Sequence, residues 1–342
     1  MQTGNGVGVG VGVTGPAKPT STLLHGVGQK ARALCFYHSA DFDGVCSAAI
    51  VSYHVPDLVF MPINYDQPFP WDMVGPEDTV YMVDFHLQPL DLMRRLVNSC
   101  EKVVWIDHHK SAIEVADSRL YTDLLRIPGI RRIGTGACAL TWEWIFGNPK
   151  NLPSLRMPPP AVVLLAQYDV WNHENPLTLP FQYGLRGIRG ISNPADPIWH
   201  GHLLDHSSRL WQSIAEEGKK ILPYLEIDNE KRAAACAFDL KWEGHNFIAI
   251  NHQLTSGQVF DSVWDEAKYH GMLTFGYRGG SWHVSMYSTR KDVDLSFIAV
   301  KYGGGGHAGA CGFECLALPF NVPHKDDTQL WPYSSGVGAG IE

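Results

Sequence analysis

Apolar runs alternate with helix-like segments along the first half of the chain. Short apolar runs predict buried strands at residues 33–37, 59–63, 79–83 and 103–106. Small apolar residues or helical spacing predict helices at residues 45–53, 87–97, 134–146 and 161–166. Strands that alternate with helices favour a doubly wound, mainly parallel sheet, so the expected fold class is α/β.

The second half of the chain has a different pattern. Residues 186–197 are rich in Gly and Pro and predict an exit from the first domain, and the amphipathic residues 203–225 predict a linker helix. Strands are then expected at residues 234–240, 247–251, 272–277 and 282–287, with helices at 261–269 and 296–301. These elements predict a second, smaller α/β domain.

We therefore expect five segments. They are a disordered Gly/Val-rich tail (1–30), a metal-binding catalytic domain (31–195), a linker helix (196–228), a substrate-binding domain (229–320) and a C-terminal tail (321–342).

Composition and charge narrow the class of protein. The chain has 342 residues, of which 45% are hydrophobic and 18% charged, as is typical of globular proteins. A net charge of −8 argues against a generic nucleic-acid coat, so a polyanionic substrate would need a metal or a local group of cations. The apolar runs are too short to span a membrane, and the odd, scattered set of seven cysteines favours reduced thiols. We expect a cytoplasmic protein without a membrane partner.

Acidic and histidine side chains follow the predicted strands. Those after the first, third and fourth strands are His38, Asp41, Asp43, Asp84, Asp107, His108 and His109. Asp169 ends the apolar helical segment that begins at residue 161. Singly, each has an ordinary alternative as a helix cap or a solvated side chain. Because the carboxyl ends of neighbouring parallel strands meet at one edge of a sheet, we expect these side chains to gather there.

Carboxylates gathered in this way would repel one another, and their pKa values would rise unless cations neutralised them. Two divalent metals bridged by one carboxylate suit phosphoryl hydrolysis, because they lower the pKa of a water and neutralise charge on the phosphate. Mixed oxygen and imidazole ligands favour Mn²⁺ and leave zinc, cobalt and iron open.

A glycine-rich segment lies near the end of the second predicted domain. Its four successive glycines, residues 303–306, precede His307. Such a run lets backbone amides approach a phosphate closely, although a plain flexible loop has the same composition. We expect this segment to face the metals across a cleft between domains.

These segments resemble, in order, the motifs of the DHH phosphoesterase superfamily. The four motifs of its first domain correspond to residues 38–44, Val83-Asp84, Asp107-His108-His109 and Asp169. Residues 303–313 resemble the signature of the family's C-terminal domain, so the likeness runs from about residue 33 to 318. One departure is that only Ser39 and Ala40 separate His38 from Asp41, where the family usually has three residues.

The resemblance implies two divalent metal ions. One would be held by His38, Asp41 and Asp84, and the other by Asp43, Asp84, His108 and Asp169, with Asp84 bridging. His109 would contact the scissile phosphate or a metal-bound water, and Asp107 would orient an imidazole. The residues expected to bind substrate are Arg290, Gly304, Gly305, Gly306 and His307.

The resemblance also implies a reaction. A phosphodiesterase of the nanoRNase or oligoribonuclease type would cut short RNA or DNA oligonucleotides to 5′ mononucleotides, with a water activated by two metals. The chain has no room for the additional domains of RecJ-type processive exonucleases. Alternatives are hydrolysis of linear or cyclic dinucleotides or of 3′-phosphoadenosine 5′-phosphate. Pyrophosphatases rank last because they lack the glycine-rich signature. An alternative from another class is an inactive nucleotide sensor, although every candidate ligand position here has a competent side chain. A homodimer is left open.

Overall fold

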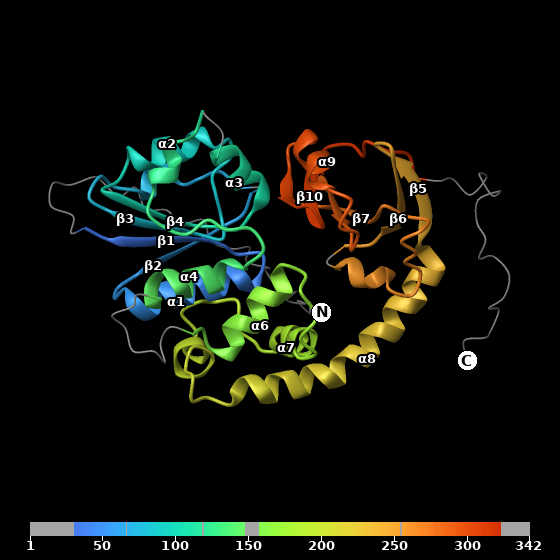
Figure 1. The fold of residues 1–342 in the computed structure, drawn as a ribbon, viewed down its shortest axis with the longest axis horizontal. Helices are drawn as coiled ribbons and strands as arrows, with labels where there is room; N and C mark the ends of the chain where they lie inside the picture. Colours follow the sequence, from blue (N-terminus) through green and yellow to red (C-terminus); the bar gives the residue numbers. More distant parts are fainter. Residues whose placement is uncertain (1–30, 66, 118–119, 148–156, 254, 323–342) are drawn as a thin grey trace, which may run out of the picture. The chain divides into compact units, whose positions relative to one another are not determined.

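The apolar runs of the first half form one parallel sheet (Figure 1). Its strands are β1 (Ala33–His38), β2 (Val59–Ile63), β3 (Thr79–Val83) and β4 (Lys102–Ile106). They are ordered β2-β1-β3-β4, and every neighbouring pair is parallel. This confirms the predicted α/β fold with a parallel sheet in the first half of the chain.

The computed structural model describes residues 31–65, 67–117, 120–147, 157–253 and 255–322. The predicted N-terminal tail, most of the predicted C-terminal tail and part of a proline-rich stretch near residue 155 lie outside these ranges. The described residues from Arg32 onward belong to one compact unit. The boundaries given above for the catalytic, linker and substrate-binding segments stay predictions.

Helices cover both faces of the first sheet (Figure 1). One face packs against α1 (Phe42–His54), α4 (Ala137–Phe146), α6 (Pro160–Asp169) and α7 (Thr178–Arg186), and the other against α2 (Asp91–Val97) and α3 (Lys110–Ala116). Alternate residues of β1 enter the two cores, Cys35 and Tyr37 on one side and Leu34 and Phe36 on the other. The doubly wound arrangement is therefore as predicted. Single 3₁₀ turns occur at Trp71–Met73 and Leu124–Arg126.

A long helix leads to the second half of the structure. After a π-helical turn at Trp199–Leu203, α8 spans Leu210–Cys236 and packs against α7. The sequence pattern did not predict α7, because Pro180 and Gly184 are typical helix breakers. Gly184 is required by packing, since a Cβ there would lie 1.9 Å from the carbonyl oxygen of Ile214 in α8.

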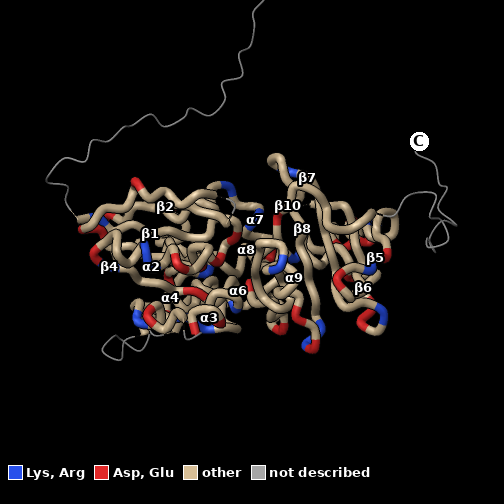
Figure 2. The backbone as a smooth tube through the Cα atoms, turned by 90° about the horizontal axis from the view of Figure 1, so that it is seen from above, with Lys and Arg blue, Asp and Glu red and all other residues tan. Residues whose placement is uncertain are grey.

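The second sheet is mixed and has six strands. They are β5 (Phe238–Trp242), β6 (His245–Asn251), β7 (Gly271–Arg278), β8 (Ser281–Tyr287), β9 (Gly305–His307) and β10 (Ala310–Cys315), in the order β5-β6-β7-β8-β10-β9. β6 and β7 are parallel, and the other neighbouring pairs are antiparallel. α9 (Ser296–Lys301) contacts β9 and β10. Basic and acidic positions are interspersed along both sheets (Figure 2).

Three predictions of local structure were wrong in this half. The helix expected over 203–225 begins seven residues later and continues to Cys236, so residues 234–236 are helical, not a strand. Residues 261–269 are not a helix; a 3₁₀ turn covers Gly257–Phe260, and Asp265 accepts a hydrogen bond from the amide of Ala267. Such a side-chain bond competes with helical pairing. For the glycine-rich segment, the structure excludes the ordinary alternative of a plain flexible loop, because the segment includes β9 and forms a hairpin with β10. Within the described ranges, no helix is long and apolar enough to cross a membrane.

Candidate metal centre

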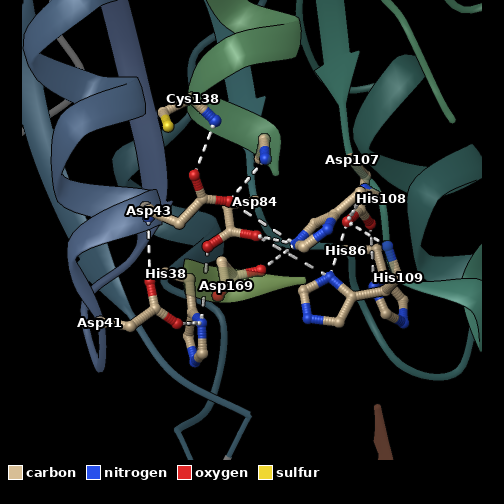
Figure 3. Close-up of polar contacts among 12 residues, drawn as sticks. His38, Asp41, Asp43, Asp84, His86, Asp107, His108, His109, Cys138 and Asp169 are labelled. Carbon is tan, nitrogen blue, oxygen red and sulfur yellow. Dashed lines mark hydrogen bonds and ion pairs between the residues drawn. The ribbon is translucent and has the colours of Figure 1, made fainter. Parts of the chain in front are cut away.

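The strand order places a ligand site at the carboxyl ends of β1 and β3. The chain moves outward from β1 to β2 and then returns to the other side of β1 as β3, so neighbouring connections diverge there. Crevices at such points are the usual ligand sites of open α/β sheets. His38 is the last residue of β1, Asp84 follows β3 directly, and Asp107 follows β4 (Figure 3).

His38, Asp41 and Asp84 form a first group of metal-competent atoms (Figure 3). The Nδ1 atom of His38 lies 3.0 Å from Oδ2 of Asp41 and 3.8 Å from Oδ2 of Asp84. Asp41 is the N-cap of α1, and its Oδ1 accepts a hydrogen bond from the amide of Gly44. A Cβ at Gly44 would lie 2.0 Å from the carbonyl oxygen of His38, so glycine lets α1 start this close to β1.

Asp43, His108 and Asp169 form a second group. The Nε2 atom of His108 lies 3.0 Å from Oδ2 of Asp169 and 3.6 Å from Oδ2 of Asp43. Asp169 comes from the last turn of α6, so a helix far along the chain completes the set that the strand ends begin. Four separate sequence motifs therefore converge on one place.

Asp84 joins the two groups. Its Oδ2 faces His38, and its Oδ1 lies 3.1 Å from Nε2 of His108. The side chain is 1% exposed, and the backbone has a φ of 54°, a left-handed conformation that Asp tolerates better than most residues. An amide hydrogen bond to the carbonyl of Ile106 holds Asp84 to β4. A backbone outlier fixed at a central ligand position is typical of functional sites.

Asp43 is held by a helix N-terminus. Its two oxygens accept hydrogen bonds from the amides of Ala137 and Cys138, at 2.5 Å and 2.9 Å, in the first turn of α4. The positive end of a helix stabilises a carboxylate there and fixes its orientation. From the sequence alone, the ordinary alternative for this motif is that Asp43 caps the following helix and Asp41 is solvated. The structure shows the reverse, because Asp41 caps α1 and Asp43 is buried.

Burial and crowding shift the pKa values of these groups in the directions that favour a cation. Burial, with the charge of Asp84 second, raises the pKa of Asp43 to about 6, and burial raises the pKa of Asp169 well above its usual range. Burial lowers the pKa of His108 and of His38, but the adjacent carboxylates outweigh it, so both pKa values lie well above the ordinary imidazole value. Protons bound to these groups thus neutralise the charge that a metal cation would neutralise.

The donor set fits divalent metal ions. Four carboxylates and two imidazoles supply the oxygen and nitrogen ligands that such ions take in proteins. The buried Oδ2 atom of Asp84 has no hydrogen-bond partner within the described part of the chain. Buried polar atoms are rarely left without a partner, so a bound cation would account for this one.

Asp107 belongs to neither of these two groups and contacts His86 and His109 instead. It is fully buried, and its Oδ1 accepts hydrogen bonds from the amides of His108 and His109 and lies 2.7 Å from Nδ1 of His109. Its Oδ2 lies 3.2 Å from Nδ1 of His86. These contacts are those expected of a residue that orients an imidazole. His86 was missed in the sequence, although its position two residues after Asp84 could have indicated it.

The second sheet brings His307 to this site. The imidazole of His307 stacks on that of His109, with ring centroids 5.2 Å apart and an angle of 9° between planes, and lies 4.6 Å from the ring of His108. Burial, followed by the neighbouring His109 and His108, lowers the pKa of His307 to about 3. An ion pair between Lys110 of α3 and Asp294, just before α9, also joins the two halves.

A cavity of about 820 Å³ lies beside the candidate metal ligands. Its wall includes His38, His109, Asp169 and His307, and also the predicted Gly304, Gly305 and Gly306. Contacts within the protein also involve this glycine-rich segment. The amide of Gly304 donates to the carbonyl of Ala299, and Gly305 and Gly306 pair with β10, so hairpin formation engages this segment.

Arg290 is not brought to the cavity, which corrects the placement expected for it. Its guanidinium contacts the carboxylate of Asp292 at 2.6 Å and the carbonyl oxygens of Glu266 and Tyr269. Arg278 and His283 line the cavity instead. Both were missed, although Arg278 directly follows a predicted strand, the feature that had identified the acidic ligands.

Comparison with known proteins gives weak likenesses. No family model matches the chain. The uncharacterized protein R106 of Acanthamoeba polyphaga mimivirus is 24% identical over 328 residues, which cover 86% of this chain and 70% of that protein.

DHH-domain proteins are among the solved structures to which the chain is similar. An exopolyphosphatase-related protein of Bacteroides fragilis matches with a TM-score of 0.48 and 12% identity, over 84% of this chain and 88% of that one. The DHH domain of PF0399, a member of a family of ribosomal proteins, matches with a TM-score of 0.44 and 15% identity, over 82% of each chain.

Proposed function

We propose that this chain is a DHH-superfamily phosphodiesterase that requires divalent metal ions and hydrolyses short oligonucleotides to 5′ mononucleotides. The observation that carries the proposal is the meeting of six side chains from four motifs in two groups that share Asp84. Motif order alone could arise by chance, but folding would not then bring the same six side chains to one edge of a sheet.

The residues present would divide between two cations. His38, Asp41 and Asp84 would hold one, and Asp43, Asp84, His108 and Asp169 the other, with Mn²⁺ the ion that suits the mixed donors best. When bound, the ions supply Lewis acidity that activates water and neutralises charge on the phosphate. The carboxylates are already oriented, because backbone amides hold Asp41 and Asp43 before any ion binds.

The surrounding residues would position the substrate. Asp107 engages Nδ1 of His109, which leaves Nε2 of that ring for the scissile phosphate. His307 closes the far side of the cavity by stacking on His109. A finite cavity next to the ligands, in a chain with a net charge of −8, supports a short substrate over a long nucleic-acid track.

A substrate panel tests the proposal. Purified protein with Mn²⁺ would be incubated with RNAs and DNAs of two to about ten nucleotides, with linear and cyclic dinucleotides, with 3′-phosphoadenosine 5′-phosphate and with pyrophosphate. We expect release of 5′ mononucleotides from the shortest oligonucleotides and loss of turnover with chelator. The exposed Asp72→Ala serves as a matched control. Preference for cyclic dinucleotides or for the bisphosphate would select an alternative substrate, and tight binding without turnover of any compound would favour the sensor.

A further inference from the structure

A second cavity, of about 680 Å³, adjoins the first. Asp41 and Asp169 lie in its wall, so it too reaches the candidate metal ligands. Asp169, Arg278 and Tyr287 line both cavities, which therefore meet beside Asp169. The wall that the second cavity does not share comes mainly from the end of α6, from α7 and from the segment after β6, and includes Tyr168, Trp171 and Arg186.

Trp171 occupies a position where glycine is usual. α6 ends at Asp169 with Val170 as its C-cap, and Trp171 follows with a φ of 58°. The amide of Trp171 donates to the carbonyl of Tyr168, and the amide of Asn172 donates to that of Gln167. This is the Schellman pattern, whose left-handed residue is most often glycine because a side chain there is strained. A large aromatic residue that keeps this strained position, in a cavity wall beside the metal ligands, suggests a need for its ring.

Two arginines of this wall have no carboxylate partner. Arg186 donates to the hydroxyl of Tyr168 and lies 4.7 Å from the ring centroid of Tyr183, and Arg278 contacts Nδ1 of His283. No ion pair is found for either arginine within the described ranges. In a chain of net negative charge, two such guanidinium groups in one wall point to an anionic ligand.

An aromatic ring and guanidinium groups without a carboxylate partner, next to a phosphoesterase centre, are suited to bind the base and the phosphate of a nucleotide. Bases stack on aromatic side chains without regard to sequence, and arginines bind phosphates. We propose that the second cavity holds one of the two nucleotide units that flank the scissile phosphate, with its base on Trp171 and its phosphate at Arg186 and Arg278. This inference rests on the proposed function. With the other unit in the first cavity, the smallest complete substrate is a dinucleotide.

Equilibrium binding tests this subsite without turnover. Calorimetry would use the Mn²⁺-loaded protein and a 5′-phosphorylated diadenosine whose bridging 3′ oxygen is replaced by methylene. That oxygen is the leaving group in release of a 5′ mononucleotide, so the analogue cannot be cleaved. Trp171→Gly removes the ring at a position that glycine favours, so we expect its thermal midpoint to stay within a few degrees of wild type. Its Kd for the dinucleotide should rise about tenfold or more. Trp171→Phe keeps a stacking ring and should stay within about threefold of wild type. Arg186→Gln should weaken binding of the dinucleotide but not of adenosine.

Trp264→Phe is the matched control, because Trp264 bonds to Thr289 and lines neither cavity. The subsite is excluded if wild type does not bind the dinucleotide, if Trp171→Gly binds it as wild type does, or if the control loses as much affinity. Dinucleotide binding that depends on Trp171 in a protein that cleaves no natural dinucleotide would keep the subsite and refute the phosphodiesterase. If wild type cleaves natural dinucleotides but Trp171→Gly binds the analogue as tightly as wild type does, the phosphodiesterase is kept and the subsite is refuted.

Discussion

The two sheets present their chemistry in different ways. In the parallel first sheet, every strand ends at the same edge, so a side chain that follows a strand reaches that edge whichever strand it follows. In the mixed second sheet, β7 and β8 are antiparallel, and residues after them leave at opposite ends. Arg278 ends β7 and faces the cavity, whereas Arg290 follows β8 and contacts the carbonyl of Tyr269 before β7 begins. A position directly after a strand is therefore enough to place a side chain at the site in a parallel sheet, whereas in a mixed sheet the direction of the strand must also be known.

The largest expected effect tests the parallel sheet at Asp84. Asp84→Asn is the suitable change, because Asn also accepts the left-handed backbone of this position and has the same size. A neutral amide that replaces the shared carboxylate should lower kcat/KM by about a thousandfold or more, which corresponds to ~4 kcal/mol. Turnover of a dinucleotide, with metal content by mass spectrometry, measures this. If the variant keeps most of its turnover at saturating Mn²⁺, Asp84 does not join two metal sites.

The next effect distinguishes the two histidines of the same edge. His108 contacts carboxylates of Asp43, Asp84 and Asp169, whereas His38 contacts those of Asp41 and Asp84 and has the unusual spacing. Loss of a residue that only supports a metal ligand typically costs about 10- to 100-fold. We therefore expect His108→Ala to lower activity by about a hundredfold or more, and His38→Ala by about tenfold. Equal loss of one ion per chain in both variants would show that the spacing has no consequence.

A smaller effect separates the two arginines of the mixed sheet. Arg278→Gln should raise KM for di- to pentanucleotides by about tenfold, because a charge-assisted contact to phosphate is lost. Arg290→Gln should change KM by less than about twofold, since its guanidinium pairs with Asp292 outside the cavity. Hydrolysis of bis-p-nitrophenyl phosphate, which has no second phosphate for Arg278 to bind, should be unchanged in both. If Arg290→Gln raised KM more than Arg278→Gln does, the substrate would contact the end of the mixed sheet at which Arg290 lies.

The smallest expected effect is on stability as a function of pH. In metal-free protein the pKa values of Asp43, Asp169, His38 and His108 are raised, so each group stabilises the folded state most when protonated. This stabilisation is lost as the pH rises. The part from Asp43 is lost as the pH passes about 6, and the part from His38 and His108 is lost above the usual imidazole pKa. Cations bind the deprotonated groups, so Mn²⁺ should raise the thermal midpoint more at pH 8 than at pH 6. An equal shift at both pH values would mean that binding displaces no protons.

The strands of the first sheet and the six candidate metal ligands could be predicted from the sequence, because each ligand lies close to an apolar run whose length is typical of a buried strand or helix. It missed α7, whose Pro180 and Gly184 are typical breakers, although close contact with α8 explains the glycine. His86 and Trp171 were also missed as site residues, since their value depends on contacts with Asp107 and on a left-handed backbone. In the second half, the side chain of Asp265 accepts an amide hydrogen bond where the sequence pattern had predicted a helix. Because β7 and β8 are antiparallel, the residue order alone could not show at which end of the sheet Arg290 lies.

We expect two divalent ions to share the carboxyl edge of the first sheet through Asp84. Calorimetric titration of metal-free protein with Mn²⁺ at pH 8, with native mass spectrometry for stoichiometry, measures how many ions bind. We expect two ions per chain in wild type, release of protons on binding, and loss of at least one ion in Asp84→Asn but not in Asp72→Ala. Binding of no ion or of one in wild type, or two ions retained in Asp84→Asn, would exclude a shared site.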